Sequence, residues 1–462
     1  MKTYISYLTI ALFSLTLVLG QEKETPPKGG EPKNFTLPEK EVVEFDNGMT
    51  LVMVPYGSIP KANIRFNFKT GNINEAENQV WLADLMVDLL EEGSTVRTAK
   101  QIADEMAGMG GNLNIGVGLH TTSISSSVLY EFAPDAIAVM ADVLKNPKWP
   151  ESELERLKND IKRRLSVDLS TPQNQAYRDF YAEIYPDHPY GRVYPTDDQV
   201  DSYTVEDIKR FYDENFGAKR MTVYIAGNFD KDAVKEAVET NLADWREGKD
   251  ASYPVATAVT SNTVKIIDRP GAPQSTIYYG IPAPSPSDDD YIALDVTNSI
   301  LGGSFASRIT SNIREDKGYT YSPFSSLDTK YKTGVWYEAA DVTTEHTGAS
   351  LQEIKNEIEK LQNEPPSKEE LDGILNYESG IYVLQNSTPN GIIGQLVFLD
   401  VHDLDESFLK NKVQNMFEVT PEKVSEMTKK YIRPENMTLI VVGDKQKIEN
   451  QIQETIQKPL KQ

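Results

Sequence analysis

The chain has 462 residues, a net charge of −23 and a hydrophobic content of 39%. This length exceeds one ordinary hydrophobic core and predicts a soluble protein of two or more globular domains. The strong acidity argues against nucleic acid or an anionic membrane as a partner. The sequence contains no cysteine, which excludes disulfides, a cysteine nucleophile and thiolate metal ligands.

The N-terminus has the pattern of an export signal. Lys2 precedes an apolar run over residues 4–19, and Gly20 follows it, so residues 1–20 predict a secretory signal peptide. The alternative is an uncleaved N-terminal anchor. Residues 21–39 are rich in Pro, Glu, Lys and Gly and predict a disordered leader. We expect an exported protein, periplasmic rather than secreted if the source has two membranes.

Short alternating segments predict β-strands at the start of each half of the chain, with helices following in both halves. The expected strands are residues 41–45, 50–54, 62–69, 121–129, 263–267 and 275–279. Residues 250–262 are polar and contain Pro254, so they predict the linker between two domains.

An internal repeat supports this division. Residues 204–228 and 420–444 share a helix with an acidic first turn, a break, a buried strand that begins at Met-Thr, and a turn containing Gly. The matching residues Met221 and Met437 are 437 − 221 = 216 positions apart. The repeat predicts two homologous α+β domains, over residues 40–249 and 263–462.

The most informative segment is an amphipathic helix over residues 82–90, which Gly93 is expected to close. Asp84 and Asp88 lie one turn apart on one face of this helix, with Val87 beside them. A zinc peptidase of the H-x-x-E-H type places two His ligands and a catalytic Glu at this spacing. This chain has Asp, Val and Asp instead.

The frame around this helix, including Leu-Leu-x-x-Gly-Ser-Thr over residues 89–95, resembles the pitrilysin/insulinase family of zinc peptidases with the metal motif removed. The resemblance covers essentially all of the chain after the signal. It implies paired α+β domains that form a clam-shell chamber. It also places the third zinc ligand near residues 162–164, where Lys162, Arg163 and Arg164 stand in place of a carboxylate.

We therefore expect no metal in this chain, and two alternatives arise for the acidic helix. Asp84 or Asp88 can form an ion pair with one of the cations at residues 162–164. Alternatively, the four acids of the helix bind a hard cation such as Ca²⁺ or Mg²⁺: Asp84, Asp88, Glu91 and Glu92. The four histidines of the chain are far apart in sequence and predict no replacement site.

The second half retains a family signature over residues 301–322, from Leu-Gly-Gly-Ser to Lys-Gly-Tyr-x-Tyr-Ser. The resemblance implies that Arg314 and Tyr321, seven residues apart, bind substrate. A guanidinium can hold a peptide carbonyl or carboxylate, and a phenol can donate to an oxyanion. The alternative is that Arg314 caps its helix and Tyr321 is a half-buried aromatic residue at the start of a strand.

Asn114 is the third candidate for substrate binding. It follows Gly110-Gly111 and precedes the strand at 121–129. The resemblance implies that Asn114 and the neighbouring edge strand receive substrate as an added strand. The Ala-x-Thr that follows this Asn in the family is replaced here by residues 115–117. The alternative is a simple loop in which the glycines permit positive φ.

These features predict a non-catalytic, substrate-binding subunit of a two-component zinc metallopeptidase that acts on peptides or small unfolded proteins. A partner of the same family, in a heterodimer, would supply the zinc and the general base. The alternative is a peptide-binding or scaffold protein without proteolysis. A third hypothesis is an independent hydrolase that uses the acidic cluster with another metal.

Overall fold

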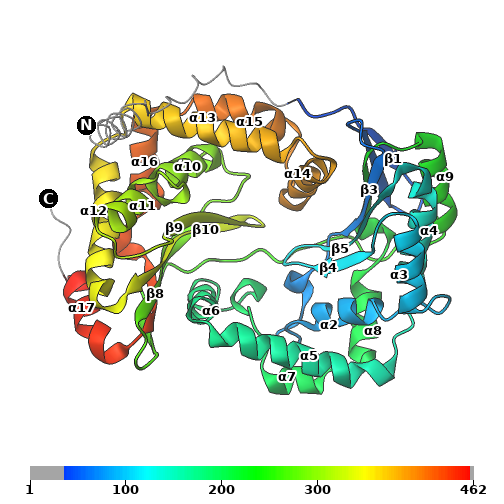
Figure 1. Cartoon of the computed structure of the whole chain (residues 1–462), viewed down its shortest axis with the longest axis horizontal. Coiled ribbons are helices and arrows are strands. Elements are labelled where there is room, and N and C mark those ends of the chain that lie inside the picture. The colour runs from blue at the N-terminus through cyan, green and yellow to red at the C-terminus, as the bar shows by residue number, and fades with distance from the viewer. Residues whose placement is uncertain (1–35, 458–462) are drawn as a thin grey trace, which may run out of the picture. The chain divides into compact units, whose positions relative to one another are not determined.

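Two β-sheets, one from each half of the sequence, organise the chain (Figure 1). A computed structural model describes residues 36–457. The first sheet has the strand order β1-β2-β6-β3-β5-β4. Its strands are β1 (Glu41–Glu44), β2 (Thr50–Pro55), β3 (Lys61–Phe68), β4 (Asn114–Val117), β5 (Thr122–Leu129) and β6 (Met221–Gly227).

The second sheet has the order β7-β11-β8-β10-β9. Its strands are β7 (Val264–Asp268), β8 (Gln274–Ala283), β9 (Phe324–Lys330), β10 (Thr333–Thr343) and β11 (Thr438–Gly443). The predicted strands are all present, and the α+β class with two sheets is confirmed.

Helices fill the remainder of each half. Those of the first half are α2 (Leu82–Leu90), α3 (Ala99–Gly108), α4 (Ala133–Lys145), α5 (Glu151–Ser170), α6 (Pro172–Ile184), α7 (Asp197–Ser202), α8 (Val205–Asn215) and α9 (Lys231–Leu242). Those of the second half are α10 (Tyr291–Asn298), α11 (Arg308–Thr310), α12 (Thr347–Asn363), α13 (Lys368–Gln385), α14 (Pro389–His402), α15 (Ser407–Phe417), α16 (Pro421–Tyr431) and α17 (Lys445–Gln457). The repeated segments form α8-β6-α9 and α16-β11-α17, the same order of elements in both halves.

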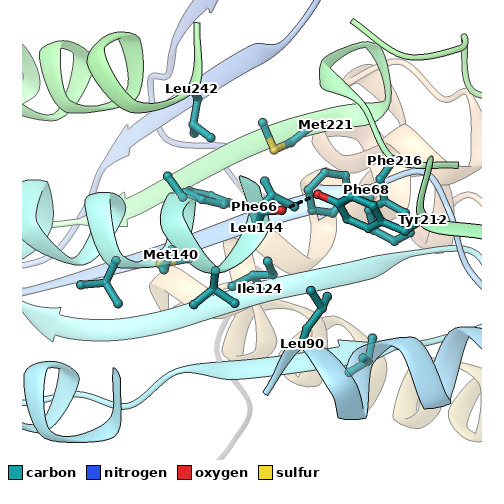
Figure 2. Close-up of a cluster of buried hydrophobic side chains, with 14 of the residues drawn as sticks. Phe66, Phe68, Leu90, Ile124, Met140, Leu144, Tyr212, Phe216, Met221 and Leu242 are labelled. Atoms are coloured by element: carbon teal, nitrogen blue, oxygen red, sulfur yellow. Dashed lines mark hydrogen bonds between the residues drawn. The ribbon is translucent and has the colours of Figure 1, made fainter. Parts of the chain in front are cut away.

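The first sheet buries one face against helices of its own half (Figure 2). Alternation along β3 directs Phe66 and Phe68 into this core, where both are fully buried. Leu90 of α2 and Leu144 of α4 come from the covering helices. The hydroxyl of Tyr212 on α8 donates to the carbonyl of Leu144, which satisfies the one polar atom of that ring.

The second face of each sheet is covered by a helix from the other half. Helix α6 packs on β8 and β10, where Phe180 contacts Tyr278 and Tyr337. Helix α14 packs on β2 and β6, where Ile392 and Leu396 join the buried cluster. Within residues 36–457 the two halves therefore form one compact unit rather than two separate bodies.

Several expectations concern the N-terminus and the linker. The predicted signal peptide and the first part of the leader lie outside the described residues. At the end of the expected leader, Leu37 is buried and Lys40 forms an ion pair with Glu406 at 2.7 Å, so this part is packed against α15. Residues 250–262 contain no helix or strand. Between residues 36 and 457 no helix is long and apolar enough to cross a membrane.

Candidate functional site

Helix α2 is held at its N-terminus by a buried carboxylate that the sequence did not reveal. Glu75 accepts hydrogen bonds from the backbone N–H groups of Trp81 at 3.1 Å and Ala83 at 2.9 Å. These are donors that the first turn of a helix leaves unpaired. Burial raises the pKa of Glu75 to about 8, although these hydrogen bonds oppose the shift. An acid a few residues ahead of the predicted helix was the only available signal.

Asp84, on the first turn of α2, is held by an amide and a cation. Its Oδ2 accepts from Asn72 Nδ2 at 2.9 Å, and its Oδ1 lies 3.7 Å from Arg164 Nη2. Burial raises the pKa of Asp84 to about 6, the Asn72 hydrogen bond and the Arg164 charge oppose this rise, and Asp88 adds to it. Asp84 is therefore a partly desolvated carboxylate with a cationic partner.

Val87 and Asp88 complete the three positions of the lost motif. Val87 is 5% exposed and packs in the first core, so the position of the family's general base carries no polar atom. Burial raises the pKa of Asp88, and the nearby Arg164 lowers it. One guanidinium thus lies close to both acids of the helix.

Arg164, on α5, is the cation that fulfils the predicted ion pair. Its guanidinium lies 5.0 Å from the ring centre of Trp81, in addition to its contact with Asp84. The neighbouring cations have other partners: Lys162 binds Asp201 at 2.6 Å and Arg163 binds Asp160 at 2.7 Å. The pairing expected for residues 162–164 is confirmed for Arg164 with Asp84.

This arrangement does not fit the zinc of the family. Zinc requires nitrogen, sulfur or carboxylate ligands that converge on one point, whereas here a guanidinium approaches Asp84 and a valine replaces the catalytic Glu. Among residues 36–457, no group of three His, Asp or Glu side chains is arranged to hold a metal ion. Of the four acids that could bind a hard cation, Glu92 instead forms an ion pair with Arg156.

Two histidines that are far apart in sequence do meet in space. The rings of His120 and His402 lie 6.3 Å apart, and His120 Nε2 is 2.8 Å from the hydroxyl of Tyr190. Burial lowers the pKa of His120 to about 3 and that of His402 to about 4. Distance along the sequence was thus a poor guide to their positions, but this aromatic cluster supplies too few ligands for a metal site.

The structure does not bring Arg314 and Tyr321 together. Arg314 Nε donates to Glu315 at 2.7 Å, and its guanidinium lies 3.8 Å from the ring centre of Phe305. Tyr321 is 86% exposed, and no contact joins it to Arg314 in the described chain. The alternative of a half-buried Tyr321 is wrong, and the substrate-binding role of the two residues stays a prediction. Phe305 borders a surface pocket of about 430 Å³ that Glu369 also lines.

Asn114 is the first residue of β4, at the edge of the first sheet. Its side-chain oxygen accepts from Asn112 Nδ2 at 2.6 Å, and its side chain is exposed. β4 pairs with β5 on one side, and no strand of the described chain pairs with its other side. The simple-loop alternative holds for the segment before Asn114, where Gly110 has a φ of 77°, but Asn114 itself belongs to a strand with an open edge.

The backbone pattern identifies which groups of β4 face outward. Gly118 N–H donates to Thr121 at 2.8 Å, and hydrogen-bonded pairs alternate along an antiparallel ladder. The N–H groups of Ile115 and Val117 therefore point to the open edge. Burial and Asp88 raise the pKa of Glu91 at the end of α2, while a hydrogen bond from the Ile115 N–H lowers it. The open edge thus begins beside the acidic helix.

Comparison with known proteins places this geometry in a family. The profile of insulinase (peptidase family M16) matches residues 52–195, and that of the peptidase M16 inactive domain matches residues 202–377. An uncharacterized zinc protease of Rickettsia felis is 25% identical over 337 residues, covering 71% of this chain and 80% of that protein. One from Streptomyces coelicolor is 22% identical over 408 residues, covering 86% and 89%.

Solved structures share the fold at low sequence identity. A protease from Helicobacter pylori superposes with a TM-score of 0.81 at 18% identity, covering 88% of this chain and 100% of that one. A peptidase M16 inactive domain from Pseudomonas fluorescens gives 0.79 at 21% identity, covering 87% and 98%. The first half of the periplasmic protease PqqL from Escherichia coli gives 0.71 at 14% identity, covering 93% and 99%.

The two profile matches span most of the chain, and they agree with the two-sheet fold and with the frame around α2. The chain belongs to the pitrilysin/insulinase family, peptidase family M16.

Proposed function

We propose that this chain is a non-catalytic, substrate-binding subunit of a two-component zinc metallopeptidase. The single observation that carries the proposal is the contrast between α2 and β4. The three motif positions on α2 lack the family's two His ligands and its Glu general base, and Arg164 pairs with Asp84 there. The edge of β4 beside them has no partner strand among the described residues.

The substrate is a peptide or a small unfolded protein bound in an extended conformation. Backbone hydrogen bonds to an open strand edge give affinity for many sequences. The Val117 N–H faces this edge, and so does the Ile115 N–H, which a peptide would take over from Glu91. A partner of the same family that carries an intact H-x-x-E-H motif supplies zinc and the general base. The heterodimer works after export, in the periplasm where the cell has one.

A peptidase assay on the purified chain tests this proposal. The chain is incubated with a quenched fluorescent peptide and zinc, alone and mixed with a family member that carries the intact motif. The proposal expects cleavage in the mixture well above that of the partner alone, and none from this chain alone. Cleavage by the isolated chain would contradict it, as would a partner whose activity does not change on mixing.

The state of Arg314 and Tyr321 favours a second candidate, a peptide-binding or scaffold protein that takes no part in proteolysis. Arg314 is engaged by Glu315 and Phe305, and Tyr321 is exposed without contact to it. Substituting Arg314 by Ala in the mixed assay separates the candidates. Stimulated cleavage that is lost in Arg314→Ala supports the subunit, whereas a partner activity that does not change on mixing with either the wild-type chain or Arg314→Ala supports the scaffold.

A further inference from the structure

One row of side chains runs across the second face of the first sheet from the open edge inward. Asn114 of β4 pairs with Ser125 of β5, Ser125 pairs with Arg65 of β3, and Arg65 pairs with Tyr224 of β6. Directly paired residues of an antiparallel sheet lie on the same face. Arg65 therefore shares its face with Asn114, two strands or about 10 Å away.

Arg65 is a cation without an anion. It forms no hydrogen bond or ion pair with any residue between 36 and 457. Burial lowers the pKa of its guanidinium, which means that water only partly solvates the charge. Arg314, in contrast, is paired with Glu315, and Asp400 on α14 is already bound to Lys69 at 2.8 Å. A partly desolvated guanidinium is stabilised most by a carboxylate.

The surroundings of Arg65 are rich in hydrogen-bond donors. Asn67 is 1% exposed, and its Nδ2 has no hydrogen-bond partner among the described residues. It lies two residues along β3, on the same face. Ser123, Ser125 and Ser127 of β5 are partly exposed on this face, opposite Asn67, Arg65 and Asn63. Buried donors normally have partners, so an unpaired amide beside an unpaired guanidinium indicates a place for an acceptor.

We propose that Arg65 binds a carboxylate of the peptide that the β4 edge holds, so that this chain selects acidic peptides. This inference rests on the proposed function and names its substrate class. A peptide added to the edge lies one strand beyond Asn114, about 14 Å from the backbone of Arg65. An extended Arg65 side chain meets a Glu side chain or a chain end that lies back over the face. The carboxylate therefore comes from a Glu side chain or from the peptide C-terminus.

Fluorescence polarisation with four labelled decapeptides tests the proposal on the full chain. The peptides alternate Thr and Val, carry a central Glu or Gln, and end in a free acid or an amide. We expect at least one carboxylate to improve affinity by about tenfold over the peptide that has neither. Comparing the Glu amide with the Gln acid identifies which carboxylate is bound. Raised salt should reduce the preference only in part, because the site is partly buried.

Substituting Arg65 by Gln should abolish the preference and leave the binding of the neutral peptide unchanged, while Arg65→Lys should keep a reduced preference. Arg433→Gln, at an exposed Arg outside the row, is the matched control and should behave as wild type. Equal thermal unfolding temperatures establish that each variant is folded. If all four peptides bind equally, or if Arg65→Gln retains the preference, this inference is wrong while peptide binding stands. If none binds, both proposals are wrong.

Discussion

The second faces of the two sheets differ, although both are covered by a helix from the opposite half. On the second sheet, β8, β10 and β11 present aromatic and aliphatic side chains that α6 buries completely. On the first sheet, only β2 and β6 are apolar beneath α14, while β3 and β5 present Asn, Arg and Ser. The same architecture thus closes one face as hydrophobic core and leaves part of the other polar, and the proposed peptide site lies beside that polar part.

The largest expected effect is on the closed face. Phe180 is fully buried between Tyr278 and Tyr337, and its ring lies against Gly280, where a Cβ would come within 2.7 Å. Phe180→Ala should lower the free energy of unfolding by about 3–5 kcal/mol, because it leaves a cavity in a packed core. Urea unfolding measures this. Ser125→Ala on the open face is the control and should change stability by less than about 0.5 kcal/mol. Equal effects of the two would refute the contrast between the faces.

The second half buries a carboxyl group in its interior. Glu338 of β10 is fully buried, neither carboxylate oxygen has a hydrogen-bond partner among the described residues, and burial raises its pKa well above the usual 4.5. Above pH 4.5 the folded protein keeps a proton that the unfolded chain has lost, so stability falls as pH rises towards the folded-state pKa.

Glu338→Gln removes this titration. We expect wild type and variant to have similar stability at pH 4, and the variant to be more stable by about 2 kcal/mol at pH 7. Unfolding at a series of pH values measures the difference. Glu236→Gln, at an exposed position, should follow wild type throughout. If the difference in unfolding free energy between Glu338→Gln and wild type is the same at every pH, the expectation is wrong. Glu338 would then be charged in the folded protein or would not titrate.

A smaller effect is expected at Arg164, which lowers the pKa of Asp84 from what burial alone would produce. Arg164→Met should raise that pKa above about 6. At high pH Asp84 is then charged without a nearby cation. The free energy of unfolding should therefore fall by about 1 kcal/mol at pH 8, a figure reduced for solvent screening, and should hardly change at pH 4. Arg163→Met is the control, since Arg163 pairs with Asp160 and with no other acid among residues 36–457. An equal loss at both pH values would mean that Arg164 acts through packing on Trp81.

The smallest expected effect concerns Glu91, which lies at the open edge of β4. Glu91 accepts a hydrogen bond from the Ile115 N–H, a group that an added strand would use. Glu91→Ala should therefore strengthen peptide binding by about twofold to fivefold, because the competing acceptor is gone. The peptide titration described above measures this. Weaker binding by the variant would show that Glu91 contributes to the site.

Local patterns were sufficient to predict much of this molecule from its sequence. Strand alternation predicted β3 and β8, and the repeat predicted the matching segments of the two halves. The resemblance of the frame around Asp84 and Asp88 to the family implied that the zinc motif is absent there. The cationic residues that replace the third ligand even predicted the ion pair at Asp84.

The missed features depend on contacts between distant segments. The exchange of α6 and α14 between the sheets has no local signature, because a helix pattern does not say which sheet it covers. Nothing in the local sequence distinguishes Glu75 and Arg65 from ordinary polar residues. In the fold Glu75 is buried and Arg65 is partly buried. Arg314 and Tyr321 kept their spacing in sequence, but the backbone between them does not bring the two side chains into contact.

Residue-resolved hydrogen exchange of β4, with and without a bound extended peptide, is the most direct test of the central claim. The account predicts slower exchange at Val117, whose N–H faces the open edge, and a smaller slowing at Ile115, whose N–H already donates to Glu91. Asn114 and Gly116, which already bond to β5, should not change. Unchanged exchange at Ile115 and Val117 with the peptide bound would contradict the claim that this family member binds peptide substrate at the edge of its first sheet.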